Sequence, residues 1–234
     1  MTTYHITEQA INMNVQLYNE FDVSSVNFSK MRKNKNGGKA VYINTGGSAG
    51  KVLVQLPYLR APFGLSAFTD EATKRTSYSL DLSFDAENED LQKKFEDIDN
   101  KVLEAVAANS QEWLGKKYNI AVMKEALYKP IVRPNKGDYP ATMKLKIMTD
   151  MKSGAFVPEA YNHLHDRVEL DTIEKGQKMM AIIDINQIWF IDNKFGVSVR
   201  LQQVLLEPSK RLPAFAFRNV EPPQEDDVEE EYDE

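Results

Sequence analysis

The chain of 234 residues is 42% hydrophobic, contains no cysteine and carries a formal net charge of −6. At roughly 100–200 residues per domain, this length fits one large domain or two small ones. The lack of cysteine excludes disulfides and thiolate metal sites. No run approaches the roughly 20 apolar residues of a membrane span. The first residues lack the basic and apolar blocks of a signal peptide, so we expect an intracellular protein that does not enter a membrane.

Three segments with β character come first along the chain, at residues 26–32, 39–45 and 51–56. Glycine-containing runs, Asn34–Gly38 and Gly46–Gly50, separate them. Such runs between β-branched segments are typical of hairpins. We therefore predict a three-stranded meander.

The pattern of apolar residues changes after an extended stretch at Tyr58–Ser66. Residues 77–84 alternate between apolar and polar side chains, which predicts a half-buried strand. Residues 87–113 instead carry apolar side chains every three or four positions, which predicts an amphipathic helix. A shorter helix is predicted over roughly residues 120–128, before Pro130. Both helices are expected to pack against the sheet.

Strand patterns return in the last third of the chain. Residues 142–148 alternate, with Lys144 and Lys146 on the face opposite the apolar residues, and a long hairpin is predicted from residues 178–192 and 195–206. Strands, a helical insert and strands again indicate a mainly β, α+β fold. Five or more strands with a helix between them suit a Greek-key barrel of the oligonucleotide/oligosaccharide-binding (OB) kind, although composition does not distinguish a barrel from a sandwich.

The charge divides the chain into two parts. Residues 220–234 hold nine acids and no base, and removing those nine from the total of 35 leaves 26 acids against 29 bases. The body is therefore weakly basic, and its tail is strongly acidic. Such a tail cannot bury enough apolar surface to offset its ordering entropy. We expect a domain over residues 1–219, with a helical insert at about 86–129, and a disordered acidic tail over 220–234.

Two motifs resemble catalytic or metal sites but do not meet their requirements. Residues 45–51 resemble a phosphate-binding P-loop, yet the first position is Thr45, the residue after Lys51 is Val52, and the following segment reads as a strand. His163 and His165 lie close together, but further residues with ligand spacing are missing. We therefore predict no catalytic residues, no metal, no cofactor and no enzymatic activity.

Basic and aromatic residues on the predicted strands and hairpins form the remaining signal. Proteins that bind single strands need basic residues that follow the phosphates and exposed aromatic rings on which nucleobases stack. Trp189 and Phe190 are adjacent on one strand, so they must point to opposite faces, and at most one lies in the same core. Arg133 and Lys136 belong to the wider basic set. The candidate nucleic-acid-binding residues are Lys30, Arg32, Lys33, Lys35, Lys39, Tyr42, Lys51, Tyr58, Arg60, Lys144, Lys146, Trp189, Phe190, Lys194 and Arg200.

Three runs carry a resemblance to a known family: residues 34–43 (NKNGGKAVYI), residues 56–66 (LPYLRAPFGLS) and the hairpin from Ile185 to Arg200. They resemble the replication single-stranded-DNA-binding family of large nucleocytoplasmic DNA viruses. That family is related at fold level to the single-strand-binding protein of short-tailed coliphages. The resemblance covers most of residues 25–219.

The resemblance implies an OB barrel with a helical insert, sequence-independent binding of single-stranded DNA, and a role in replication, recombination or repair. It also implies that the acidic tail contacts the protein's own groove and replication partners such as a polymerase, a helicase or a primase. A viral protein of this kind would act where viral DNA replicates in the host cell, in the nucleus or a cytoplasmic factory. The tail residues concerned are Glu225, Asp226, Asp227, Glu229, Glu230, Glu231, Tyr232, Asp233 and Glu234.

Several alternatives stay open at the level of sequence. An acidic-tailed protein-interaction or structural module without DNA binding has the same gross composition. The sequence also leaves open a homodimer, the preference for DNA or RNA, and which aromatic rings stack on bases.

Overall fold

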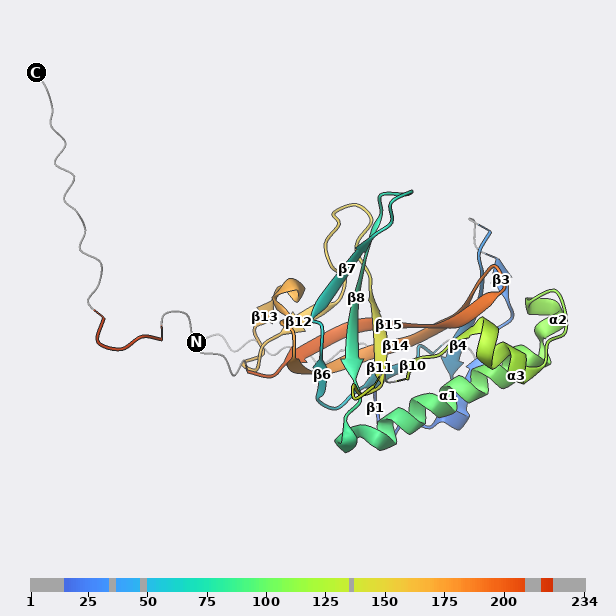
Figure 1. Ribbon diagram of the computed structural model, residues 1–234, viewed down its shortest axis with the longest axis horizontal. Coiled ribbons are helices and arrows are strands. Elements are labelled where there is room, and N and C mark those ends of the chain that lie inside the picture. Colours follow the sequence, from blue (N-terminus) through green and yellow to red (C-terminus); the bar gives the residue numbers. More distant parts are fainter. Residues whose placement is uncertain (1–14, 34–36, 47–49, 135–136, 209–215, 221–234) are drawn as a thin grey trace, which may run out of the picture.

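Two long strands, β14 (Gln177–Ile191) and β15 (Lys194–Leu206), form an antiparallel hairpin through the middle of the molecule (Figure 1). The computed structural model describes residues 15–33, 37–46, 50–134, 137–208 and 216–220. The hairpin turns at Asp192, whose φ of 53° lies in the left-handed region, where Asp is tolerated better than most residues. The long hairpin predicted from the sequence is therefore confirmed.

The two hairpin strands and three others close into a five-stranded barrel. β14 pairs with β6 (Leu59–Ala61), β6 with β8 (Thr76–Ser83), and β8 with β11 (Thr142–Ile147), all antiparallel. β11 then pairs in parallel with β15, which returns to β14. This circuit, with its one parallel contact, is the strand order of an OB-type Greek-key barrel. The predicted mainly β, α+β fold with a helical insert is confirmed.

The strands before the barrel extend the sheet along β14. β4 (Lys39–Thr45) pairs with β14 on one edge and with β2 (Val26–Phe28) and β3 (Arg32–Lys33) on the other. β5 (Leu53–Gln55) pairs with β14 and with β1 (Gln16–Leu17). The predicted meander is therefore wrong at its third strand. Both edges of β4 are occupied, so β5 joins β14 instead, apart from an isolated bridge between Thr45 and Gly50.

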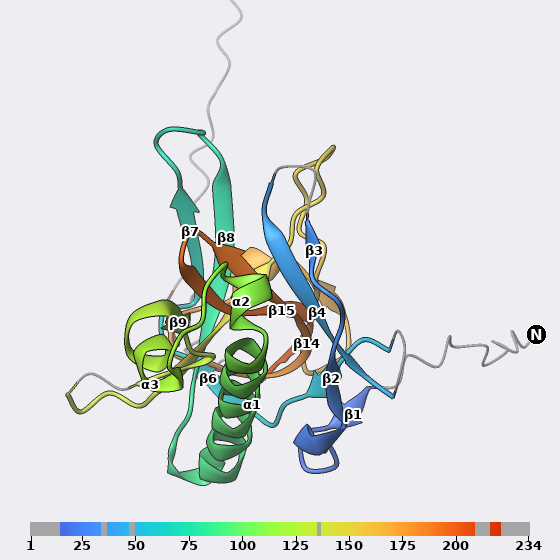
Figure 2. The same cartoon turned by 90° about the vertical axis from the view of Figure 1, so that its right-hand side faces the viewer.

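The helical insert lies between β8 and β11 and covers one end of the barrel. Its main element is α1 (Glu89–Ala108), which runs below the barrel in Figure 1 and is foreshortened in front of the strands in Figure 2. The predicted apolar stripe is buried, from Leu91 to Val106. The shorter predicted helix is present as α3 (Ile120–Val122) followed by a π-helical turn. That turn is η3 (Met123–Leu127). The other insert elements are η2 (Ala86–Asn88) and α2 (Ser110–Trp113).

Short elements complete the fold. The hairpin of β7 with β8 projects from the side of the barrel away from α1 (Figure 1). Among the described residues, no helix is long and apolar enough to cross a membrane. The remaining elements are η1 (Val23–Ser25), β7 (Leu65–Thr69), β9 (Tyr128–Lys129), β10 (Val132–Arg133), β12 (Glu159–Tyr161), β13 (Arg167–Val168) and η4 (Leu170–Thr172).

The pair of strands β8 and β11 shows where sequence periodicity held and where it did not. On β11, Lys144 and Lys146 are exposed between buried apolar neighbours, as predicted. On β8, the polar face is not solvated along its whole length, because Asp81 and Ser83 are buried. Ser83 donates its hydroxyl hydrogen to the Arg60 carbonyl, and Asp81 lies beneath Arg133. Alternation was therefore correct, but the last two polar residues of the strand are buried as well.

Candidate nucleic-acid interface

A groove of about 470 Å³ lies on the outer face of the barrel, between β4, β9, β10, β11 and the tip of the β14–β15 hairpin. Its lining residues come from segments far apart in the sequence. None of the described lining residues is acidic. The bases that line it are Lys39, Lys129, Arg133, Lys144 and Lys146.

Trp189 lies in this groove because of small residues on both neighbouring strands. Trp189 pairs with Ala40 of β4 on one side and with Gly196 of β15 on the other. A Cβ atom placed on Gly196 would lie 2.8 Å from Cζ2 of the indole and 2.8 Å from the Lys129 carbonyl oxygen. The indole therefore lies across Gly196, toward Lys129. Trp189 is only half-buried, so part of its ring is open to the groove.

The row of cross-strand partners that contains Trp189 has a basic residue on each side of the indole. Arg32 pairs with Ala40 on the β4 side, and Lys129 pairs with Gly196 on the β15 side. Paired residues in a sheet point to the same face. Five strands thus contribute one row with a cation at each end and the indole between them.

Phe190 points to the opposite face and belongs to the core. It is 5% exposed, lies 5.9 Å from the Phe195 ring in a stacked arrangement, and lies 6.0 Å from Trp113 edge-on. Tyr128 extends this aromatic cluster, with its ring centroid 5.1 Å from that of Phe195. The expectation that Trp189 and Phe190 point to opposite faces agrees with this arrangement. Phe190 itself is corrected from a binding candidate to a residue of the groove floor, because its ring has no free face.

A second row of cross-strand partners, two residues from Trp189 along β14, adjoins the groove. Gln187 pairs with Tyr42 of β4 and with Ser198 of β15. The Arg32 guanidinium carbon lies 5.6 Å from the centroid of the Tyr42 ring, which is a cation–π contact. Arg32 and Tyr42 therefore lie beside the groove as a pair, with one face of the tyrosine ring already occupied.

Buried acids lie under the β8–β11–β15 part of the face. Lys144 pairs with Asp81, and an Arg133 Nη1 lies 3.8 Å from an Asp81 carboxylate oxygen. Further along, Lys146 pairs with Arg200, which in turn pairs with Asp184. Burial raises the pKa of Asp184, while a hydrogen bond from Asn186 and the charges of Lys51 and Arg200 lower it. These acids offset part of the positive charge but leave the exposed layer basic.

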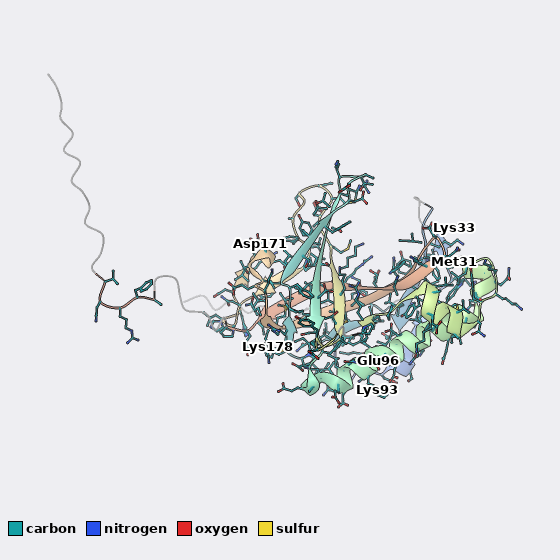
Figure 3. All side chains as sticks on the ribbon, in the orientation of Figure 1. Met31, Lys33, Lys93, Glu96, Asp171 and Lys178 are labelled. Atoms are coloured by element: carbon teal, nitrogen blue, oxygen red, sulfur yellow. The ribbon has the colours of Figure 1, made fainter. Side chains whose placement is uncertain are left out.

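The remaining predicted residues divide by position. Lys30, Lys33 and Lys194 are exposed near the β3 and β14–β15 ends of the sheet, and Figure 3 shows Lys33 at that end. Lys51, Tyr58 and Arg60 do not line the groove. They belong to the β5–β6 part of the sheet, where the Arg60 guanidinium packs 3.0 Å from the position of a Cβ on Gly176. Lys35 and the tail residues 221–234 lie outside the described residues.

Lys129 is a groove residue that sequence reasoning missed. It follows the predicted short helix and precedes Pro130, so local pattern suggested only a helix end. Its position comes from the parallel pairing of β9 with β15, which no local signal predicts.

The two histidines singled out in the sequence do not form a metal centre with their neighbours. His163 and His165 are exposed in a turn in which the Asn162 side-chain oxygen accepts hydrogen bonds from the Leu164 and Asp166 amides. In the part of the chain that the structure describes, no three His, Asp or Glu residues are grouped to hold a metal ion.

Comparison with solved structures finds a phage protein of similar outline. The single-stranded DNA-binding protein from bacteriophage Enc34 in complex with ssDNA has a TM-score of 0.39 and 12% identity, covering 79% of this chain and 97% of that one. Its C-terminal truncation has a TM-score of 0.41, 12% identity and the same coverage.

Comparison with other sequences finds a viral relative and a family. "Uncharacterized protein L291" of Acanthamoeba polyphaga mimivirus is 27% identical over 158 residues, which is 66% of this chain and 26% of that protein. The chain thus spans about a quarter of the length of this relative. Residues 71–219 match the family described as "Family of unknown function (DUF5871)". That match takes in the insert, β8, β11 and the β14–β15 hairpin, and the chain belongs to this family.

Proposed function

We propose that this protein binds single-stranded DNA without sequence preference. The observation that carries the proposal is the groove itself, where Lys129, Arg133, Lys144 and Lys146 lie with a half-buried Trp189. The groove is lined by β11, the third strand of the barrel, and strands 2–3 form the face that OB folds use for oligonucleotides.

The chemistry of the groove follows from its two kinds of residue. Ammonium and guanidinium groups attract phosphates and release their counterions, which gives affinity that falls as salt rises. These contacts fix the position of the strand without reading its sequence. The open part of the Trp189 ring offers a stacking surface worth roughly 1–3 kcal/mol per base, and every base has a face that can use it.

The wider biological role is part of the same proposal. Residues 1–219 would form the binding domain, and the acidic tail over 220–234 would compete with DNA for the groove. A tethered polyanion has a high effective concentration, so it covers a basic surface weakly and yields to DNA. The tail would also contact replication proteins, including a polymerase, helicase or primase, at the site of viral DNA replication in the host cell. The complementary charge of tail and groove supports this assignment.

A salt-dependent titration with fluorescent oligo-dT tests the proposal. We expect wild-type affinity to fall steeply with salt. In the double variant Lys144→Ala/Lys146→Ala, the slope of log K against log salt should decrease by about 1.4, since each single-strand phosphate contact contributes about 0.7.

The matched control is Lys93→Ala, which removes one lysine from the exposed face of α1. Lys93 forms a surface ion pair with Asp97 at 3.2 Å, and such pairs contribute little to stability. Its affinity and slope should equal those of the wild type. Equal slopes for the wild type and the Lys144/Lys146 variant would reject the groove as the binding site. Absence of salt-dependent binding by the wild type would reject the function.

A further inference from the structure

A single buried carboxylate holds the wall of the groove that carries Lys129 and Arg133. The wall is the segment Tyr128–Pro134, and the carboxylate belongs to Asp99 of α1. Asp99 accepts hydrogen bonds from the Tyr128 hydroxyl and from the amides of Ile131 at 2.9 Å and Val132 at 3.2 Å. These three donors lie between or directly beside the two basic residues of the wall.

The wall lies between two cavities. Lys129, Ile131 and Arg133 line the basic groove. Tyr128, Val132 and Pro134 line a second cavity of about 320 Å³, which Asp99 also lines. The residues thus alternate between the two cavities, and Asp99 reaches the wall from the side opposite the bases. Figure 1 shows β10 between α1 and β11.

The strand pairings of the wall are too short to fix it alone. β9 and β10 have two residues each, and Pro130 between them has no amide hydrogen. The carboxylate of Asp99 accepts hydrogen bonds from the amides of Ile131 and Val132, the two residues that follow Pro130. Asp99 is 7% exposed, and none of the ion pairs between described residues includes it.

Burial of this carboxylate without a basic partner costs folding free energy. Burial raises its pKa to about 6, against the opposing effect of its three hydrogen bonds. A residue with that cost, bonded only to the wall, is expected to specify the position of the wall.

We propose that Asp99 is a positioning residue for the nucleic-acid interface, which holds Lys129 and Arg133 at the groove through the backbone of Tyr128–Val132. This inference rests on the proposed single-strand binding. It adds a residue that lies outside the groove and never touches the nucleic acid.

The test is a set of double-mutant cycles on the full chain, measured by titration with fluorescent oligo-dT. In the wild-type background, Lys129→Ala and Arg133→Ala should each weaken binding roughly threefold to tenfold and lower the salt slope by about 0.7. In the Asp99→Asn background, each should weaken binding less than about twofold, because the wall no longer presents these bases. Lys144→Ala, on β11, is the matched control and should keep its full effect in both backgrounds.

Tyr128→Phe provides a milder variant in case Asp99→Asn does not fold. It removes one of the three hydrogen bonds, so the Lys129→Ala effect should shrink partially. Amide hydrogen exchange should also become faster at Ile131 and Val132 in both variants, while the centre of the β14–β15 hairpin stays unchanged.

The outcomes separate the two proposals. Full, additive effects of Lys129→Ala and Arg133→Ala in the Asp99→Asn background would overturn the positioning role and leave the binding function intact. A Lys144→Ala effect that shrinks equally would show general damage to the fold and would also overturn it. A wild-type protein that does not bind oligo-dT would reject both the function and the inference.

Discussion

The groove and the outer surface of α1 carry opposite charge on one small body. The described groove lining holds five bases and no acid. The exposed face of α1 holds mostly acids, and Figure 3 shows Lys93 and Glu96 along it. The exposed acids of the helix are Glu89, Asp90, Glu96, Asp97 and Glu104.

Two of the three lysines of α1 donate to backbone groups and do not lie among these acidic residues. Lys94 Nζ donates hydrogen bonds to the carbonyls of Tyr18 at 2.7 Å and Phe21 at 2.8 Å. Lys101 Nζ donates to the carbonyls of Val23 and Ser24. A small net charge of the body therefore conceals a strong separation of charge. Such a field steers a polyanion toward one side of the molecule.

The largest expected effect is on the free energy of unfolding and concerns Asp99, the buried acidic residue of α1. Its pKa rises from 3.8 in the unfolded chain to about 6 in the folded protein. Between these values the folded state binds more protons, so the free energy of unfolding falls as pH rises through that range. The contribution amounts to about 3 kcal/mol between about pH 3 and pH 7.

Denaturant unfolding of the wild type and Asp99→Asn across this pH range measures the effect. The stability of the Asn variant relative to the wild type should increase with pH, since Asn does not titrate. Exposed carboxylates titrate alike in both proteins and cancel in the comparison. A stability difference that stays constant with pH would contradict the raised pKa.

The next effect concerns Trp189, the groove residue on which we propose that a nucleobase stacks. Trp189→Ala should weaken oligo-dT binding by about 2 kcal/mol, or about 30-fold, through loss of one stacked base. Trp189→Phe should retain most of the affinity. Trp113 is buried in the aromatic cluster, so quenching of tryptophan fluorescence on binding should disappear with either Trp189 variant. Quenching that persists would place the DNA away from Trp189.

The smallest effect concerns the tail, whose charge has the same sign as the α1 face. Deleting residues 220–234 should tighten binding to oligo-dT by a few fold at low salt, because a tethered competitor is removed. At high salt the intact and truncated proteins should converge, since screening weakens the tail and the DNA alike. Weaker binding after truncation would reject competition by the tail.

How far the sequence predicted the site is clearest at two neighbouring pairs of residues. Lys144 and Lys146 were predicted to share an exposed face, and Trp189 and Phe190 were predicted to point to opposite faces, because alternation along a strand is a local property. Lys129 was missed and the third strand of the meander was misplaced, because both depend on which strand edges are free. Asp99 looked like one more acid on an amphipathic helix, since its three hydrogen-bond donors are 29 to 33 residues away.

By itself, the sequence determined the elements, their buried faces and the division of charge between body and tail. These follow from the periodicity of apolar residues and from composition, which act over a few residues. Only the tertiary structure decided which basic residues lie near Trp189, which aromatic ring forms the floor of the groove and which acidic residue supports the wall. Those choices depend on strand pairing across the barrel, where Gly196 and Ala40 leave room for one indole and where β9 joins β15 to bring Lys129 beside it.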